Sequence, residues 1–341
     1  MEQVRSPTAA QSMLRLITGS WVAQAIYVAA KLSIADRLVA GPQSAATLAD
    51  LTGTHPRALY RVLRALASVG VFHEDDEGRF KLTPLAEPLR SDVPGSVRAF
   101  AVMMGSEWVW RSWGEVMHSV HTEKAAFEQV YGEPLFEYYA KNPDAARTTM
   151  EGLTSRSVPE NAAVVDAYDF IRLGTVVDIG GGQGTLLASI LTANPQLRGI
   201  LFEMPHVIAA AKQTFKNAGS ARRCELVSGD FFASAPPRGD LYILKKVIHD
   251  WEDEQARIII GHCRSVIPDQ GRLLLIENVV PQGNEPSFSK LIDLLMMVYP
   301  GGRERTEAEY RKLLGSVGFT LNRVIPTTSL VSIIEALPSE T

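Results

Sequence analysis

The stretch VVDIGGGQGTLL, residues 176–187, decides the fold of this chain. An apolar strand reaches Asp178, four glycines follow within five positions, and an apolar helix begins after them. Glycine adopts positive φ and lets the backbone approach a ligand, and a helix N-terminus presents unpaired amides to an anionic group. A tight turn without a ligand is the alternative, but it needs fewer glycines. We therefore expect a ligand site at Gly180 and Gly182.

The sequence after this turn alternates between strands and helices. Apolar strands are predicted in GILFEM, CELVSGDFF, DLYILKKVI and GRLLLIENVV, and helices in HVIAAAKQTFKNAG, QARIIIGHCRSVIP and TEAEYRKLLGSVG. The stretch FTLNRVIPTTSLVSIIEAL predicts two further strands in an antiparallel hairpin. This alternation predicts a doubly wound α/β sheet with helices on both faces. Such sheets bind ligands outside the carboxyl ends of their strands.

The N-terminal part has a different pattern. Residues 11–40 and 44–70 have helical periodicity, with Thr54 as the expected N-cap and Pro56 in the first turn of the second stretch. VFHEDDEGRFKLTP predicts a small hairpin, so the order is that of a winged helix. The segment WVAQAIYVAA is expected to be a buried helix. A helix in this region would be apolar around most of its circumference. That apolar surface is larger than one small domain can cover, so we expect a homodimer.

The composition excludes several classes of protein. Of the 341 residues, 46% are hydrophobic and 21% charged, as in a globular protein with sizeable cores. The net charge of −4 argues against general nucleic-acid binding. Two isolated cysteines are too few for a disulfide framework or a zinc site, so a cytoplasmic location is expected. The sequence contains neither the pattern of a signal peptide nor an apolar stretch long enough to span a membrane.

A winged helix also suggests a transcriptional regulator. Arg57, Arg61 and Arg64 would lie on one helix face, as DNA recognition requires. Residues 11–100 nevertheless contain 10 Lys or Arg against 8 Asp or Glu, and the expected wing, EDDEG, is acidic. Because an acidic wing repels phosphate, a dimerisation module is the favoured interpretation.

Acidic and aromatic residues follow the next two strands. Glu203 ends the second strand at about the distance expected for a carboxylate that binds ribose hydroxyls. Asp230 and Phe231 end the third, where they would accept from an exocyclic amine and cover an adenine ring. The glycine spacing is G-x-G-x-G, and Thr185 replaces the third glycine of a dinucleotide fingerprint, which disfavours an NAD-type oxidoreductase. An adenosine pocket is predicted.

The motifs VVDIGGGQGT, FEMPHV, GDFF, KKVIHDW, LLLIENVVP and GGRERTEAEY together resemble the plant and bacterial small-molecule O-methyltransferases that use S-adenosylmethionine. The resemblance spans nearly the whole chain. It implies a class I methyltransferase Rossmann-like fold with sheet order 3-2-1-4-5-7-6, preceded by a winged-helix dimerisation domain. The expected domains are residues 1–105, a helical linker 106–165 that contributes to the substrate pocket, and a catalytic domain 166–341.

The resemblance also assigns the chemistry. His249 follows the fourth strand and is the implied general base for a hydroxyl, most simply a phenol of a small aromatic metabolite; an ordinary helix-start histidine beside Asp250 is the alternative. Glu277 would hold the imidazole, and Glu304 would flank the substrate. The cofactor-binding residues implied are Asp178, Gly180, Gly182, Glu203, Met204, Asp230, Phe231, Lys245 and Trp251. Methyl transfer needs no metal, and none is expected. A relative using the same cofactor for other chemistry is the minority interpretation.

Two departures from the family pattern limit the resemblance. The second strand ends in Glu203-Met204 where the family usually has Asp-Leu, and Tyr299 precedes Pro300 where plant members often have asparagine. Plant substrate contacts are therefore not transferred. The candidate substrate-pocket residues are Phe136, Met150, Asp250, Met296 and Tyr299, with Trp108, Trp113 and Met297 as further candidates. Met and aromatic residues at such spacing are also typical of ordinary core.

Overall fold

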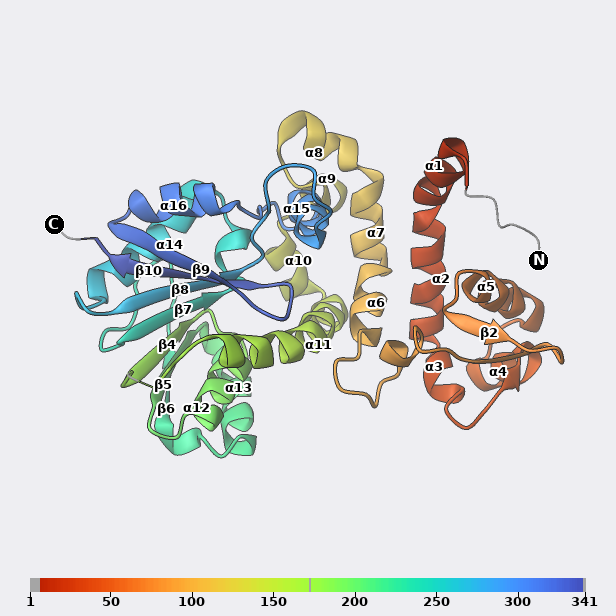
Figure 1. The fold of residues 1–341 in the computed structure, drawn as a ribbon, viewed down its shortest axis with the longest axis horizontal. Helices are drawn as coiled ribbons and strands as arrows, with labels where there is room; N and C mark the ends of the chain where they lie inside the picture. Colours follow the sequence, from red (N-terminus) through yellow and green to blue (C-terminus); the bar gives the residue numbers. More distant parts are fainter. Residues whose placement is uncertain (1–6, 172, 340–341) are drawn as a thin grey trace. The chain divides into compact units, whose positions relative to one another are not determined.

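The computed structural model describes residues 7–171 and 173–339, and the chain forms two compact units (Figure 1). One unit consists of Met1–Arg111 and Tyr139–Arg156, and the other of Ser112–Tyr138 and Ser157–Thr341. Each unit is therefore built from two separate stretches of sequence. The predicted domain boundaries at residues 105 and 165 stay a prediction.

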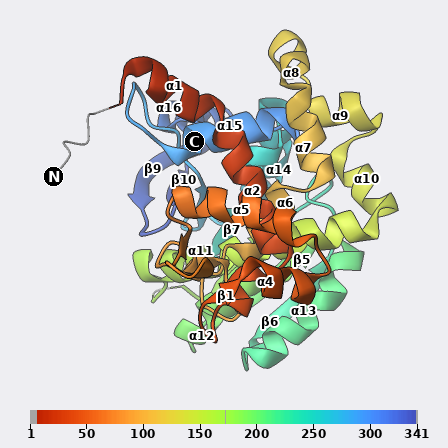
Figure 2. The same ribbon diagram turned by 90° about the vertical axis from the view of Figure 1, so that its right-hand side faces the viewer.

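The N-terminal unit is mostly helical (Figure 2). It also contains a small antiparallel sheet of order β1-β3-β2. Its elements are α1 (Ala9–Ile17), α2 (Gly19–Lys31), α3 (Ile34–Arg37), β1 (Gln43–Ser44), α4 (Ala45–Thr52), α5 (Pro56–Ser68), β2 (Phe72–Glu74), β3 (Arg79–Leu82), η1 (Glu87–Leu89) and α6 (Arg98–Met104). Helices α4 and α5 followed by the hairpin β2–β3 have the predicted order. The short strand β1 was not predicted.

The start of α5 corrects one expectation. The N-cap is His55, not Thr54, and its side chain caps no backbone N–H. The Thr54 hydroxyl instead forms a hydrogen bond with the hydroxyl of Thr52 (2.9 Å). Pro56 occupies the first turn as expected, and its fixed φ starts the helix without a side-chain cap.

Helices α1 and α2 are much more exposed in the single chain than predicted. In α2 only Ala29 and Ala30 are buried, and in α1 no residue is. Trp21 is 73% exposed and Leu16 75%, because nothing in the described part of this one chain covers them. Within the described residues no single helix is long and apolar enough to cross a membrane. The α1–α2 pair passes that test only when joined, across a 41° bend.

The C-terminal unit contains a seven-stranded sheet of order β6-β5-β4-β7-β8-β10-β9 (Figure 1). Numbered along the chain this order is 3-2-1-4-5-7-6, as predicted. Pairs among the first five strands are parallel, and β10 is antiparallel to both β8 and β9. The strands are β4 (Thr175–Ile179), β5 (Arg198–Glu203), β6 (Cys224–Ser228), β7 (Leu241–Lys245), β8 (Arg272–Glu277), β9 (Phe319–Pro326) and β10 (Ser332–Pro338).

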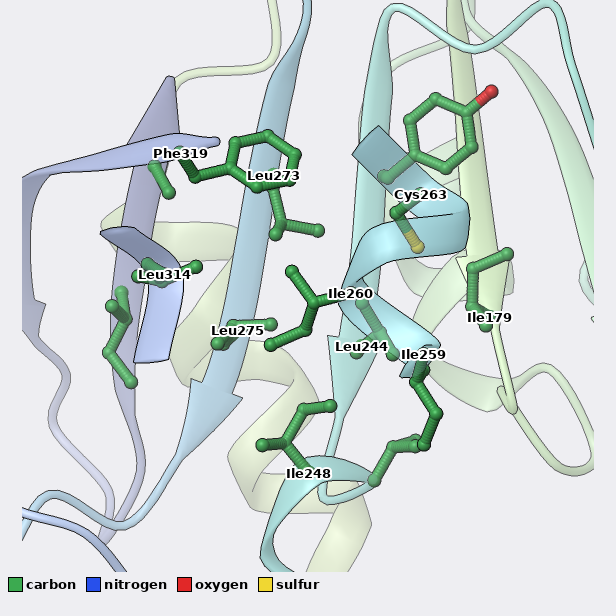
Figure 3. Close-up of a cluster of buried hydrophobic side chains, with 14 of the residues drawn as sticks. Ile179, Leu244, Ile248, Ile259, Ile260, Cys263, Leu273, Leu275, Leu314 and Phe319 are labelled. Carbon is green, nitrogen blue, oxygen red and sulfur yellow. The ribbon is translucent and has the colours of Figure 1, made fainter. Parts of the chain in front are cut away.

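Helices cover both faces of this sheet. The helices between and beside the strands are α12 (Thr185–Ala193), α13 (Pro205–Asn217), η2 (Ala221–Arg223), η3 (Ile248–Asp250), α14 (Asp253–Val266), α15 (Phe288–Val298) and α16 (Glu307–Gly315). On one face Ile259, Ile260 and Cys263 of α14 pack against Leu244 and Leu275 of the strands (Figure 3). On the other face α12 and α13 form a second apolar core with the sheet. The sheet is therefore rigidly held where its strands end.

Residues 107–167 form five helices. They are α7 (Glu107–Gly114), α8 (Val116–Thr122), α9 (Ala126–Tyr131) and α10 (Leu135–Lys141), and the long α11 (Pro143–Ala167) follows. Helices α8 and α9 contact α15, which sequence patterns did not predict as a helix. Helix α11 crosses the unit boundary between Arg156 and Ser157, shortly before its internal Pro159.

Candidate active site

The glycine turn after β4 depends on its glycines. Gly180, Gly182 and Gly184 have φ of 65°, 58° and 72°, values that residues with a Cβ rarely adopt. A Cβ on Gly181 would lie 2.4 Å from Oδ2 of Asp178. The backbone therefore passes directly over the end of β4, and α12 begins there with Gly184 as its N-cap.

Two carboxylates lie beside this turn. Glu203 at the end of β5 accepts from the N–H of Gly182 (3.0 Å) and from the N–H of Met204 (2.7 Å). Asp178 is buried, and neither of its oxygens has a hydrogen-bond partner among the described residues. Burial raises the pKa of Asp178 to about 7, although the charge of Lys245 opposes the shift. Glu203 is thus fixed over the glycine turn, and Asp178 lies beneath it.

An aromatic group surrounds the end of β6. Asp230 is exposed and accepts from the N–H of Phe232 (2.8 Å), which fixes the loop after the strand. The ring of Trp251 lies edge-on to Phe232 (4.7 Å between centroids) and to Phe231 (6.2 Å). Phe136 of α10 stacks on Trp251 at 6.3 Å. Side chains from three separate segments of the C-terminal unit therefore form one aromatic wall.

Two lysines at the end of β7 share one buried carboxylate. Glu160 of α11 forms an ion pair with Lys245 (3.2 Å) and accepts a hydrogen bond from Lys246 (2.6 Å), whose φ of 53° is left-handed. Asn161 accepts from Lys245 (2.7 Å) and donates to the hydroxyl of Thr185 (3.1 Å). Burial lowers the pKa of the Lys245 ammonium, and Glu160 opposes that shift. These contacts join α11 to the end of β7 and the start of α12.

His249 lies in η3, just after β7, and a glycine lets another loop approach its backbone. A Cβ on Gly302 would lie 2.0 Å from the carbonyl oxygen of His249, so only glycine fits. At this close approach the N–H of Arg303 donates to the same carbonyl (2.8 Å). The loop before α16 and the histidine turn are therefore held together through their backbones.

Arg305 adds a second connection between this loop and the histidine turn. Its guanidinium is fully buried and donates to the carbonyls of Ile248 (3.0 Å) and Trp251 (2.8 Å). It also pairs with Asp253 at the start of α14 (2.9 Å). The carbonyls before and after the histidine turn are thus bound by one planar cation, which restricts how the turn can move.

The imidazole of His249 lies among three carboxylates. Its Nδ1 is 3.0 Å from Oε1 of Glu304 and 3.7 Å from Oε2 of Glu277, and its Nε2 is 3.6 Å from Asp250. The roles of the two glutamates differ from the expectation. Glu304 makes the hydrogen bond to the ring, whereas Glu277 accepts from the backbone N–H groups of Val247 (3.2 Å) and Ile248 (2.9 Å).

These carboxylates control the proton affinity of the ring. Burial lowers the pKa of His249, but Glu277, Asp250 and Glu304 outweigh it and raise the pKa to about 9. Burial also raises the pKa of Glu277 to about 7, against the opposing charge of His249. Other charged or titratable groups around this cluster are Lys246, Asp293, Arg303, Arg305 and Tyr310. The three carboxylates therefore favour the imidazolium form of His249.

The candidate substrate residues are less closely grouped. Met296 and Tyr299 are buried, and Tyr299 lies edge-on to Phe127 at 5.3 Å in an aromatic cluster. Phe136 is half exposed beside Trp251, and Asp250 adjoins His249. Met150 belongs to the other unit, on α11. These five assignments, and the roles of the other site residues, stay predictions.

The structure also identifies site residues that sequence patterns missed. Glu160, Phe232, Asn278 and Arg305 all contact predicted site residues. Asn278 and Arg305 stand next to the predicted Glu277 and Glu304 in the sequence, and both are buried polar residues in a catalytic segment. Their position next to predicted catalytic residues is the sequence feature that could have identified them. The partners of Glu160 are 85 and 86 residues away, beyond any local pattern.

Family comparisons agree with this architecture. Residues 113–320 match the model of an O-methyltransferase domain, and residues 14–92 match that of an O-methyltransferase dimerisation domain. The chain belongs to the O-methyltransferase family. The predicted family, fold class, enzyme class and cofactor are confirmed.

Relatives of this O-methyltransferase cover almost its entire length. It is 47% identical over 326 residues to a phenazine O-methyltransferase of Lysobacter antibioticus, a match covering 96% of this chain and 95% of that protein. The crystal structure of LaPhzM has a TM-score of 0.91 at 46% identity and covers 97% of this chain. NcsB1 from neocarzinostatin biosynthesis, solved with S-adenosylmethionine and 2-hydroxy-5-methyl naphthoic acid, has a TM-score of 0.82 at 32% identity over 98% of this chain.

The residues at the carboxyl edge of the sheet fit S-adenosylmethionine. The glycine turn leaves its backbone uncovered at Gly182, where a Cβ would meet nothing within 4 Å. Glu203 offers carboxylate oxygens beside that turn, and Phe231 and Trp251 offer flat apolar faces nearby. The carboxyl group of Asp178 lies beneath the turn without a hydrogen-bond partner among the described residues, and a nearby cationic ligand would favour its charged form.

Proposed function

We propose that this O-methyltransferase transfers a methyl group from S-adenosylmethionine to a phenolic hydroxyl of a small aromatic metabolite, with His249 as the general base. The observation that carries the proposal is the 3.0 Å contact between Nδ1 of His249 and Glu304. Because Glu304 is a carboxylate, Nδ1 carries the proton of that bond, so in the neutral form of the ring Nε2 is left to accept one. The hydroxynaphthoic acid in the NcsB1 structure supports an aromatic hydroxyl as the acceptor class.

Each residue of the site would have a separate role in binding or proton transfer. Bound S-adenosylmethionine supplies an electrophilic methyl group. Glu203 would hold its ribose, and Asp230 and Phe231 its adenine, as the family resemblance implied. His249 would accept, at Nε2, the proton that the hydroxyl loses, and later release it to solvent. Glu304 would stabilise the imidazolium that forms, while Glu277 holds the backbone of the histidine turn.

Calorimetric titration with S-adenosylhomocysteine tests the cofactor part. We expect micromolar binding that Glu203→Ala weakens at least about tenfold. The carboxylate of Glu203 would accept two charge-assisted hydrogen bonds from the ribose hydroxyls, and alanine removes both. Glu225→Ala is the matched control, because Glu225 is an exposed glutamate on the neighbouring strand β6 that pairs only with Arg238 among the described residues. Equal affinity in wild type and Glu203→Ala contradicts the assignment of the pocket.

Assays with a panel of phenols test the chemistry. His249→Gln should lose roughly 10²- to 10⁴-fold in kcat, the range of general base catalysis, while keeping its affinity for S-adenosylhomocysteine. An aminophenol in the panel separates transfer to oxygen from transfer to nitrogen. Wild-type activity in His249→Gln would remove the general base from the mechanism.

We also propose that the enzyme is a cytoplasmic homodimer of secondary metabolism, with the exposed apolar residues of α1 and α2 in the dimer interface. These residues are Met13, Leu14, Leu16, Ile17 and Trp21. A second copy is the fitting occupant, because residues 14–92 match a dimerisation domain. Sedimentation at micromolar concentration should give a dimer, and Trp21→Glu with Leu16→Glu should shift it towards monomer. A wild-type monomer would overturn this proposal.

A further inference from the structure

We propose that Asn278 is a positioning residue for methyl transfer, because it orients Glu304 towards Nδ1 of His249. The proposal rests on the proposed role of His249 as general base and adds a residue to it. Asn278 follows β8 directly and is buried. Its Nδ2 donates to Oε1 of Glu304 at 2.7 Å.

One oxygen of Glu304 receives both side-chain donors. Oε1 accepts from Asn278 and is also 3.0 Å from Nδ1 of His249, whereas Oε2 is buried without a partner among the described residues. The backbone N–H of Glu304 is fixed separately by Asp293 (2.8 Å). Because the two oxygens of a carboxylate are equivalent, the amide fixes the rotation of the group: the oxygen that Asn278 binds is also the one directed at Nδ1 of His249. Asn278 thus selects the carboxylate conformation that contacts the imidazole.

The amide of Asn278 can have only one orientation here. Turned by 180°, its carbonyl oxygen would face a carboxylate oxygen at hydrogen-bond distance, and two acceptors repel each other. In the observed orientation Oδ1 is buried and lacks a partner among the described residues. A buried carbonyl without a partner lowers stability, so the residue is poorly explained as a stabilising one. Its contact with Glu304 is the function that the geometry leaves.

The consequence for the histidine is the choice of tautomer. Glu304 accepts only from a protonated Nδ1, so an oriented Oε1 holds neutral His249 in its Nδ1–H form. That form alone presents an unprotonated Nε2, the atom that would accept the substrate proton. Asn278 would therefore act on the reaction through two hydrogen bonds, from its own amide to Glu304 and from Glu304 to His249.

Asn278→Leu and Asn278→Ala test this chain of contacts. Both remove the donor, and both also remove the unpartnered carbonyl, which should help the variants to fold. We expect kcat to fall about 10- to 100-fold, as for other residues that orient a functional histidine, with unchanged affinity for S-adenosylhomocysteine. Asn322→Leu is the matched control, because Asn322 donates to the buried Glu335 (2.6 Å) on β9 and β10, which lie at the far edge of the sheet. It should keep wild-type kcat.

Nitrogen NMR of the histidine rings gives a readout that a purely structural role would not change. The chain has 7 histidines, so the signals of His249 can be assigned by comparison with His249→Gln. Above the pKa of His249, wild type should show the Nδ1–H tautomer, and Asn278→Leu should shift the population towards Nε2–H. An unchanged tautomer with unchanged kcat in both Asn278 variants would overturn the proposal. Full activity in His249→Gln would instead remove the proposed function itself, so the two failures are distinguishable.

Discussion

Replacing Gly302 with alanine should impair catalysis by displacing the turn that carries His249. A Cβ at this position would lie 2.0 Å from the carbonyl oxygen of His249 and 2.8 Å from the backbone of Asp250. Ordinary contact begins at 3.4 Å, so the two backbones would have to separate by about 1.4 Å. Neither atom belongs to a flexible side chain, so the backbone itself must move.

A backbone displacement of that size should lower the catalytic rate by a predictable order of magnitude. A catalytic group that is misplaced by about 1 Å can lose roughly 10²-fold in rate, and we expect a decrease of at least this size in kcat for Gly302→Ala. The hydrogen bond from Arg303 N–H to His249, now 2.8 Å long, should also break. Binding of S-adenosylhomocysteine should change far less, because Glu203 and the glycine turn lie on β5 and β4.

The assay compares kcat, measured with a phenol that wild type methylates, with cofactor affinity measured by calorimetry. Gly261→Ala is the control. It lies inside α14, and a Cβ there meets nothing within 4 Å. It should keep kcat and gain about 0.5–1 kcal/mol in stability from its better helix propensity. A Gly302→Ala enzyme with kcat within twofold of wild type would refute the argument that this glycine sets the position of His249.

Three further predictions follow from buried charges. A general base acts only when it is unprotonated, and the pKa of His249 is raised to about 9. The value of kcat/KM should therefore rise with pH between 7 and 9 and then level off. A flat pH profile would contradict this role of His249. Arg305→Met should lower the free energy of unfolding by about 3 kcal/mol in urea titrations, whereas Arg311→Met, which removes an exposed pair, should cost less than about 1 kcal/mol. Glu160→Gln should destabilise the enzyme by about 3 kcal/mol at pH 7, because it leaves Lys245 buried without its carboxylate. That loss should become smaller as the pH rises through the lowered pKa of Lys245, because a neutral lysine needs no carboxylate, and a loss that does not change with pH would refute the reasoning.

Most elements of the C-terminal unit are predictable from a local signal, and α15 is an exception. Apolar runs of strand length alternate with helical periodicity, and the glycines after Asp178 mark the first turn. Because parallel strands bring their carboxyl ends to one edge of the sheet, the sequence alone predicts that Glu203, Asp230 and His249 lie at that edge. The family resemblance supplied the sheet order, which alternation alone leaves open.

The errors arose where distant contacts decide the structure. Thr54 has the chemistry of an N-cap, but the helix starts one residue later and its hydroxyl bonds to Thr52 instead. The division of roles between Glu277 and Glu304 depends on distances to a ring that comes from another segment. Asn278 has no distinguishing local pattern, since its significance comes from a residue 26 positions away. Sequence therefore indicated which residues gather at the site but not which atoms pair.

Each compact unit consists of two separate stretches of sequence, and this limits how the enzyme can be recombined with its relatives. The unit that carries the cofactor edge also includes Ser112–Tyr138, whose helices α8 and α9 pack on α15. A chimaera with a single crossover near residue 157 would combine α15 from one parent with α8 and α9 from the other. A chimaera that keeps these helices together should therefore need three crossovers, near residues 112, 138 and 157. Natural recombination at these points would move Ser112–Tyr138 and Ser157–Thr341 together, so α8, α9 and α15 would come from the same parent.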